Sequence, residues 1–154
     1  MDLCTVASLT ATQGRVLGVD FGDTRTGLAL SDPSRFLASG IGYISPGGIE
    51  KTAARVAEIA SEKGASAIVV GLPRNMDGSE GPRAARCREF AQRVADKLPS
   101  SPVAMIDERL TTVSATRYLN ETNTRGRSRK SVIDTLSAQN FLQNALDLLR
   151  SRDC

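Results

Sequence analysis

Residues 15–31 read RVLGVDFGDTRTGLALS, which is two short apolar runs separated by a polar turn. The runs at 15–21 and 27–31 have the length and composition of β-strands, and the turn between them is short enough for a hairpin. A third run of strand type, residues 40–45, ends at Pro46-Gly-Gly. Three consecutive strands with short connections predict an antiparallel meander at the start of the fold.

After this meander the apolar pattern changes to helical spacing. Apolar residues from Ile49 to Ala60 recur every three or four positions and predict a helix that ends at Gly64. Residues 65–72 form an unbroken apolar run, typical of a strand covered on both faces. The remaining pattern predicts a helix from about Pro82, a strand at 103–107, a short helix at 111–119 and a longer helix at 131–149. The fold class is therefore α/β: a mixed five-stranded sheet, the meander plus parallel strands, with helices on both faces.

Length and composition indicate one globular domain. With 154 residues, 40% hydrophobic and 24% charged, we expect a single domain over residues 15–150 after a disordered lead-in at 1–14. The longest apolar stretch is eight residues, far below a membrane span, so no membrane partner is expected. Three cysteines without metal-ligand spacing, and no basic signal-peptide region, favour a reducing, cytoplasmic location.

The residues that are missing restrict the chemistry. There is no histidine, which excludes Ser-His-Asp and Cys-His catalysis and His-ligated zinc. Tryptophan is absent and aromatic residues make up 4%, which argues against a surface on which successive bases stack. Catalysis must therefore use carboxylates, Lys and Arg, hydroxyls, the backbone or a hard metal ion.

Carboxylates stand at the ends of two predicted strands. Asp20 ends the first strand, and Gly22 and Gly27 in the following segment allow a ligand to approach the backbone closely; the alternative is an aspartate that merely ends a strand. Asp107 and Glu108 follow the last strand in the same way. Because adjacent residues of a strand point to opposite faces, only one of this pair should reach a shared site.

A third acid, Asp134, lies on the predicted last helix. It shares the apolar stripe of that helix with Ala138, Phe141 and Ala145, where an unpaired buried carboxylate would be costly. The structural alternative is a capping box formed with Ser131. Three carboxylates from separate elements, without histidine, are typical of an oxygen-only site for Mg²⁺ or Mn²⁺, and such ions can promote cleavage of a phosphodiester.

Positive charge is concentrated in the segment that leads to Asp134. No acid lies between Glu121 and Asp134, and without the four cations of that segment the net charge of +3 would become −1. We expect either a solvated turn or a loop that docks an anionic partner. The four cations are Arg125, Arg127, Arg129 and Lys130. The helix from Pro82 carries a basic flank of its own, expected to be solvated, formed by Arg83, Arg86, Arg93 and Lys97.

Four blocks of sequence together resemble the YqgF family of pre-16S rRNA nucleases and Holliday junction resolvases, in the RNase H-like superfamily. The resemblance extends from about Arg15 to Leu149. The blocks are LGVDFGDTRTG at 17–27 with SDP at 31–33, VGLPRNMDGSEGPR at 70–83, DERLTT at 107–112 and RKSVID at 129–134. Arg74 stands where the family commonly has an apolar residue, and Ser131 where a basic one is common.

The resemblance implies an RNase H-like fold and a metal-binding catalytic set formed by Asp20, Glu108 and Asp134, with Glu108 favoured over Asp107. Substrate contacts are expected from basic residues of the matching blocks and from the basic segment. These are Arg25, Arg109, Arg125, Arg127, Arg129 and Lys130.

The implied function is a Mg²⁺- or Mn²⁺-dependent nuclease that processes the 5′ end of pre-16S rRNA in ribosome biogenesis. Its partner would be structured RNA. Two alternatives remain open at this point: a Holliday junction resolvase acting on branched DNA, and a non-catalytic RNA-binding assembly factor. An ATP-dependent phosphotransferase of the related actin-like fold would need two such domains, and this chain offers one.

Overall fold

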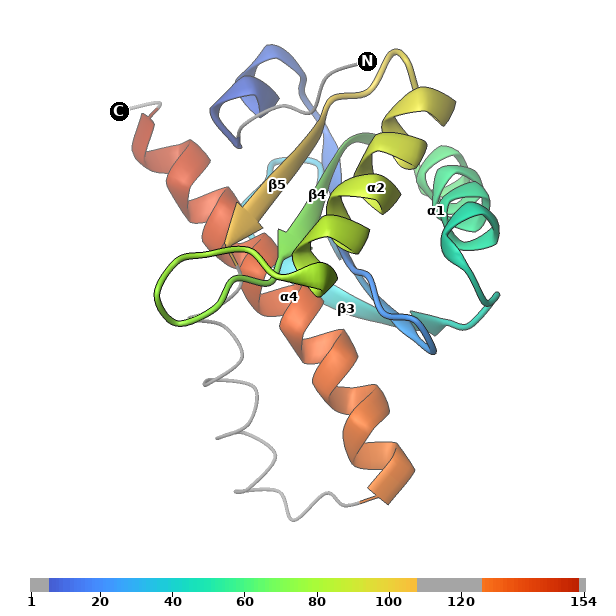
Figure 1. Ribbon diagram of the computed structural model, residues 1–154. Coiled ribbons are helices and arrows are strands. Elements are labelled where there is room, and N and C mark those ends of the chain that lie inside the picture. The colour runs from blue at the N-terminus through green and yellow to red at the C-terminus, as the bar shows by residue number, and fades with distance from the viewer. Residues whose placement is uncertain (1–5, 108–125, 153–154) are drawn as a thin grey trace.

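The computed structural model describes the backbone of residues 6–107 and 126–152 and the side chains of residues 9–107 and 135–150. Five strands form one sheet in the order β3-β2-β1-β4-β5 (Figure 1). The antiparallel meander is β1 (Arg15–Asp20), β2 (Thr26–Ser31) and β3 (Ala38–Ile44). On the other side of β1 lie the parallel strands β4 (Ala65–Leu72) and β5 (Val103–Asp107). The predicted mixed sheet is confirmed.

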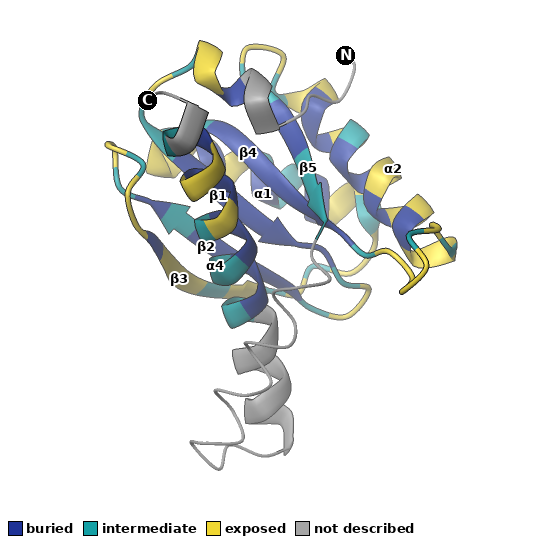
Figure 2. Cartoon of the chain, turned by 90° about the vertical axis from the view of Figure 1, so that its left-hand side faces the viewer, coloured by how far each residue is buried: buried dark blue, intermediate teal, exposed yellow. Residues whose placement is uncertain are grey.

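Helices cover both faces of this sheet. Two of them, α1 (Ile49–Lys63) and α2 (Pro82–Lys97), lie side by side on one face, and α4 (Gly126–Arg152) crosses the other (Figures 1 and 2). Because side chains of a strand alternate between faces, β1 supplies Leu17 and Val19 to the core under α1 and α2, and Val16 to the core under α4. The central strand is therefore buried on both sides.

The amino-terminal segment differs from its expected disorder. Residues 6–11 form a short 3-10 helix, η1 (Val6–Ala11), and Leu9 is 0% exposed in the core beneath α4. The guanidinium of Arg35 holds the segment by donating hydrogen bonds to the carbonyl oxygens of Gly14 (2.6 Å) and Leu9 (2.8 Å) and to Thr12 Oγ1 (2.9 Å). The prediction of a disordered lead-in is wrong for residues 6–14, because a distant arginine and a buried leucine anchor them.

The last helix is longer than its sequence pattern predicts. It begins at Gly126 instead of residue 131 and ends at Arg152 instead of residue 149. Arg127, Arg129 and Lys130 therefore belong to a helix, and the expectation of a flexible loop is wrong for these three positions. The short helix expected at 111–119 lies outside the described residues. Across the described part of the chain, no helix combines the length and apolarity needed to cross a bilayer.

Candidate active site at the carboxyl end of β1

Asp20 is the last residue of the central strand and is only 9% exposed. It lies on the face of the sheet that α4 covers, because it alternates in phase with Gly18 and Val16, which both face that helix. A Cβ atom added to Gly18 would lie 2.9 Å from the Cβ of Leu142, so glycine is needed there for α4 to pack directly on β1. The sheet thus presents a nearly buried carboxylate toward α4.

The strand register puts a glycine on each side of Asp20. On β2 its cross-strand partner is Gly27. On β4 the pairing of Val19 with Val70 puts Gly71 at the next level, beside Asp20. Neither neighbour has a side chain, and the row continues to Tyr43 of β3, which pairs with Gly27 and is 49% exposed. Asp20 therefore stands between two glycines, neither of which places a side chain beside its carboxylate.

Tyr43 and Gly71 were not recognised from the sequence as parts of this row. Gly71 lies inside the apolar run of residues 65–72, and Tyr43 lies in a strand whose register shifts between Leu28 and Ala29 of its neighbour. That irregularity determines on which face of the sheet Tyr43 lies, and no local sequence pattern predicts it. Of the two, only Gly71, a glycine inside an apolar run, is a usable signal in the sequence.

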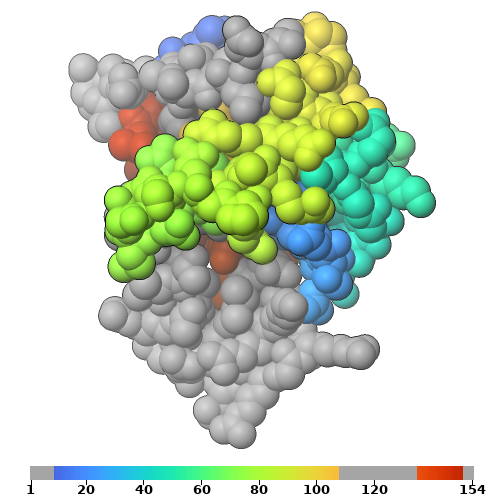
Figure 3. All heavy atoms as spheres, in the orientation of Figure 1, coloured from blue at the N-terminus to red at the C-terminus, as the bar shows by residue number. Residues whose placement is uncertain are grey.

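The turn after Asp20 is tight and contacts α2. A Cβ atom on Gly22 would lie 2.3 Å from the carbonyl oxygen of Arg25, so only glycine fits. Arg25, one of the predicted substrate contacts, is half-buried in this turn. Asp23 reaches the opposite way and forms an ion pair with Arg86 of α2, with its Oδ1 2.6 Å from Nη2 and 2.9 Å from Nε. The hairpin turn and the start of α2 are thereby joined at the surface (Figure 3).

The loop from β4 to α2 reaches the same edge and is anchored by Glu80. Its carboxylate accepts two hydrogen bonds from Arg88, at 2.7 and 2.8 Å, and lies 3.8 Å from the guanidinium of Arg74. The hydrogen bond from Arg88 lowers the pKa of Glu80, and the charges of Arg88 and Arg74 lower it further. Arg74, which departs from the usual apolar residue of the family, thus has an acidic neighbour within this loop.

The last strand ends at this edge too, but its terminal acid faces away from α4. Ile106 packs against the core under α4, whereas Met105 packs against the core under α1 and α2. By the same alternation Asp107 takes the face of Met105, opposite to that of Asp20. Glu108 and Arg109 lie outside the described residues.

The helix α4 runs antiparallel to β1. Its carboxyl end approaches the beginning of β1, where Leu149 and Gly14 line the same pocket, while Ala138 and Leu142 lie against Gly18. The predicted sheet-facing stripe is confirmed for Ala138, Phe141 and Ala145, which are all fully buried. Asp134 belongs to the next turn toward the amino end of α4, and its side chain, like those of the basic residues from Arg127 to Lys130, is outside the described set.

The structure thus brings together the strand ends and the helix that carry the predicted acids, with Asp20 as the one side chain of the three that is described. Arg125 also lies outside the described residues. Within the described ranges, no group of three acids or cysteines is close enough to hold a metal ion. The donor chemistry at Asp20, a carboxylate between two glycines with no nitrogen ligand, fits a hard cation such as Mg²⁺.

A central strand ending in a buried carboxylate, an antiparallel meander and a last helix laid across β1 define the RNase H-like class of folds. Residues 14–148 match the family described as RuvX, Holliday junction resolvase, and the chain belongs to this family. The resemblance to the YqgF family is confirmed.

Similar proteins agree with this assignment. A protein of Leuconostoc citreum named "Putative pre-16S rRNA nuclease" is 46% identical over 136 residues, which cover 86% of this chain and 94% of that protein. One of Ruminiclostridium cellulolyticum with the same name is 42% identical over 134 residues, with the same coverage. Among solved structures, RuvC of Thermus thermophilus aligns with a TM-score of 0.55 at 14% identity, over 89% of this chain and 96% of that one. The fowlpox virus Holliday junction resolvase gives 0.51 at 9%, over 89% and 99%; these two likenesses show the fold.

Proposed function

We propose that this protein is a metal-dependent phosphodiester hydrolase whose acids are Asp20, Glu108 and Asp134, and that it processes the 5′ end of pre-16S rRNA. The observation that carries the proposal is the position of Asp20: a nearly buried carboxylate at the end of the central strand, between two glycines and on the face covered by α4.

The geometry of α4 supports Asp134 as a partner of Asp20. Ala138 lies against Gly18 and the helix is antiparallel to β1. From Gly18 to Asp20 the strand advances by two residues, about 6.6 Å, and from Ala138 back to Asp134 the helix advances by four residues, about 6 Å. The two acids are therefore expected at the same level along the sheet. The capping-box alternative fits less well, because Ser131 is already inside a helix that begins at Gly126.

The direction of Asp107 supports Glu108 as the third acid. Asp107 takes the face of Met105, away from α4, so it is on the wrong side of the sheet to join Asp20. This leaves Glu108 for the shared site, in agreement with what the family resemblance implies. In this arrangement Asp20, Glu108 and Asp134 would hold Mg²⁺ or Mn²⁺, which activates water and stabilises the leaving oxygen.

The other roles belong to cations of the chain. Arg25 in the turn after Asp20 and Arg109 after the last strand are proposed to orient the strand of nucleic acid at the acids. Arg125, Arg127, Arg129 and Lys130 are proposed to contact phosphates and to give affinity without reading the sequence. No protein nucleophile and no histidine are needed, which agrees with the composition.

The names of the relatives favour precursor rRNA as the substrate. The family description and the solved resolvases make branched DNA the second candidate. Both are polyanions that the same acids and cations could accept, so the substrate must be distinguished by experiment.

The test is a cleavage assay with and without Mg²⁺ on a precursor 16S rRNA end and on a four-way DNA junction. We expect the wild type to cleave the RNA only with the metal, and Asp20→Asn to lose at least about 10³-fold in rate, the scale of removing a group that acts in the transition state. Asp96→Asn, an exposed acid of α2 that accepts a hydrogen bond from Gln92, is the matched control and should retain full activity.

Three outcomes would contradict the proposal in different ways. Cleavage of the DNA junction but not of the RNA would favour the Holliday junction resolvase. Cleavage by the Asp20→Asn variant at the wild-type rate would show that the three acids do not form the catalytic site. RNA binding without cleavage by the wild type would support the non-catalytic assembly factor.

A further inference from the structure

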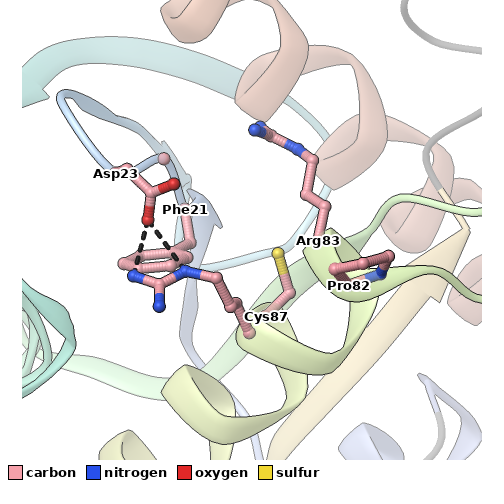
Figure 4. Close-up of a pocket in the computed structure, with 7 residues that line it drawn as sticks. Phe21, Asp23, Pro82, Arg83 and Cys87 are labelled. Atoms are coloured by element: carbon pink, nitrogen blue, oxygen red, sulfur yellow. Dashed lines mark hydrogen bonds and ion pairs between the residues drawn. The ribbon is translucent and has the colours of Figure 1, made fainter.

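A second candidate binding site lies on the other side of the sheet edge from the Asp20 carboxylate. It is a pocket of about 220 Å³ between the turn that follows β1 and the first turn of α2 (Figure 4). The pocket begins at Phe21, the residue directly after Asp20, and none of the roles proposed above uses it. It lies next to the candidate active site, because Phe21 directly follows Asp20 in the chain.

The floor of the pocket is apolar and closely packed. Phe21 and Cys87 are 3% and 2% exposed, and the Phe21 ring stacks on Phe90 with centroids 4.4 Å apart and an angle of 13° between the ring planes. Pro82, an exposed residue at the start of α2, forms a further apolar wall. Such a surface favours a flat, uncharged group and offers little to a bare phosphate.

The rim of the pocket carries two arginines in different electrostatic states. Arg86 is fixed and compensated by its ion pair with Asp23. Other cations of α2 are likewise paired: Arg93 and Lys97 both contact Glu50, at 3.1 and 2.6 Å. Arg83 has no ion-pair partner among the described residues, and its side chain extends from α2 away from Cys87 (Figure 4). Three of the four cations of the basic flank of α2 are thus paired with acids, and the fourth, Arg83, lies at the pocket.

We propose that this pocket holds one unstacked base of the nucleic acid strand, next to the phosphodiester that is cut, while Arg83 binds the phosphate of that nucleotide. This rests on the proposed nuclease function and deepens it, because it requires an unpaired nucleotide beside the cleavage site. A continuous duplex would not satisfy it. The substrate class is then a strand at a single-stranded end, a loop or a branch.

The combination of surfaces is what selects a nucleotide over other ligands. A phosphate alone would leave the apolar floor unused, and an apolar side chain of a protein would leave the Arg83 charge unused. A nucleotide has both a flat face and an anion, and an immobilised guanidinium such as that of Arg86 is a surface on which bases stack in RNA complexes. The low aromatic content of the chain is consistent with this proposal, because binding one base requires a single pocket and not a row of aromatic rings.

Adjacency to Asp20 gives the pocket a function in positioning. Consecutive Cα atoms are about 3.8 Å apart, so Phe21 in the pocket floor and Asp20 at the acids are linked with almost no freedom. A base seated on Phe21 would hold the neighbouring phosphodiester at the edge of the sheet where Asp20 lies. The strand would cross this edge from the α2 side to the α4 side.

Binding measured in EDTA tests the inference separately from cleavage. The probes are a 12-nucleotide thymidine strand and a strand of the same length in which every nucleotide is abasic, so that the phosphates are equal in number. We expect the wild type to bind the strand with bases at least about five-fold more tightly, the scale of stacking one base. Cys87→Leu, which fills the pocket, should abolish this preference and leave affinity for the abasic strand unchanged.

The phosphate contact has its own variant and control. Arg83→Gln should weaken binding of both strands and lower the slope of log affinity against log salt by about 0.7, the contribution of one single-strand phosphate contact. Arg93→Gln, which removes the same charge from the same helix at a paired position, should change neither. Should thermal melting show that Cys87→Leu does not fold, competition on the wild type replaces it: thymidine 5′-monophosphate should displace the strand with bases at a lower concentration than ribose 5-phosphate.

Equal binding of the two strands by the wild type would overturn the inference, and so would a folded Cys87→Leu protein that still prefers the strand with bases. Equal competition by the two monophosphates would also overturn it. Identical effects of the Arg83→Gln and Arg93→Gln substitutions would do the same. None of these readouts requires cleavage. If the wild type binds the strand with bases more tightly but cleaves no nucleic acid, the proposed function is contradicted while the base-binding pocket is supported.

Discussion

The residues beside Asp20 on β2 and β4, Gly27 and Gly71, carry no charge. If Asp134 and Glu108 complete the site, three negative charges repel one another until a cation binds. We therefore expect Mg²⁺ to raise the melting temperature of the wild type more than that of Asp20→Asn or Asp134→Asn. At 100 times the dissociation constant, the gain in the free energy of unfolding is about 2.7 kcal/mol.

Thermal melts in EDTA and in Mg²⁺ measure this difference, with Asp96→Asn as the control that should gain as much as the wild type. Without metal, the Asn variants should be as stable as the wild type or more so. An Asp134→Ala variant that loses about 1 kcal/mol whether or not Mg²⁺ is present would instead identify a helix-capping role.

Glu80 predicts a pH effect on the loop between β4 and α2. Its hydrogen bond from Arg88 lowers its pKa in the folded state below the ordinary value of 4.5. The carboxylate therefore stabilises the fold above pH 4.5, and this contribution is lost as the pH falls through the folded-state pKa. Glu80→Gln should melt below the wild type at neutral pH and approach it in acid. Glu62→Gln on α1 is the control; a difference that persists unchanged at low pH would contradict the role of the charge.

At the scale of elements, the contact of α4 with β1 depends on Gly18. A methyl group there would lie 2.9 Å from the Cβ of Leu142 and 3.3 Å from the carbonyl oxygen of Ala138, both close to the backbone of the helix. Gly18→Ala should therefore lift α4 and cost about 1–3 kcal/mol, the usual range for overpacking. A shift of α4 would also displace Asp134. The cleavage rate should therefore fall by a larger factor than the loss in the free energy of unfolding alone would explain.

Chemical denaturation and the cleavage assay together test this, with Gly47→Ala as a glycine variant outside the packed elements, where no atom lies within 4 Å of the new Cβ. Gly47 has a positive φ of 82°, so its substitution carries backbone strain without disturbing α4. Full activity in a destabilised Gly18→Ala protein would show that the helix does not position a catalytic group.

Local sequence patterns account for the strands of the sheet but not for η1. All five strands could be predicted because their runs are short and bounded by turn residues, although β3 spans Ala38–Ile44 instead of residues 40–45. The helix η1 could not, because Arg35 holds it across more than twenty residues of sequence and Leu9 is buried by α4. For the site, Asp20 was visible as an acid at a strand end, whereas Tyr43 depends on a register shift that the sequence does not announce.

For the whole molecule, positive charge at the beginning of α4 should dominate binding to nucleic acid. Replacing Arg125, Arg127, Arg129 and Lys130 by Ala removes up to four phosphate contacts, each worth about 0.9 of slope in a plot of log affinity against log salt for a duplex. We expect the slope to fall by up to about 3.6 and the loss to be equal for unrelated sequences.

Filter binding or fluorescence anisotropy at several salt concentrations provides the measurement. Arg55→Ala with Lys63→Ala on α1, on the opposite face of the sheet, is the control and should leave the slope unchanged. A quadruple variant with the wild-type slope would show that these cations do not touch phosphate.

The contact between η1 and α4 joins the first described element of the chain to the last. Until the ribosome has released the residues of α4, Leu9, Val16, Ala29 and Val69 have no cover on that face of the sheet. During synthesis the apolar residues on this face of the sheet are therefore exposed, and they are a binding surface for chaperones. If Asp134 is a catalytic acid, the polypeptide also gains its proposed nuclease activity only after α4 has been synthesised, so a product truncated before α4 would be unable to cut the RNA around it.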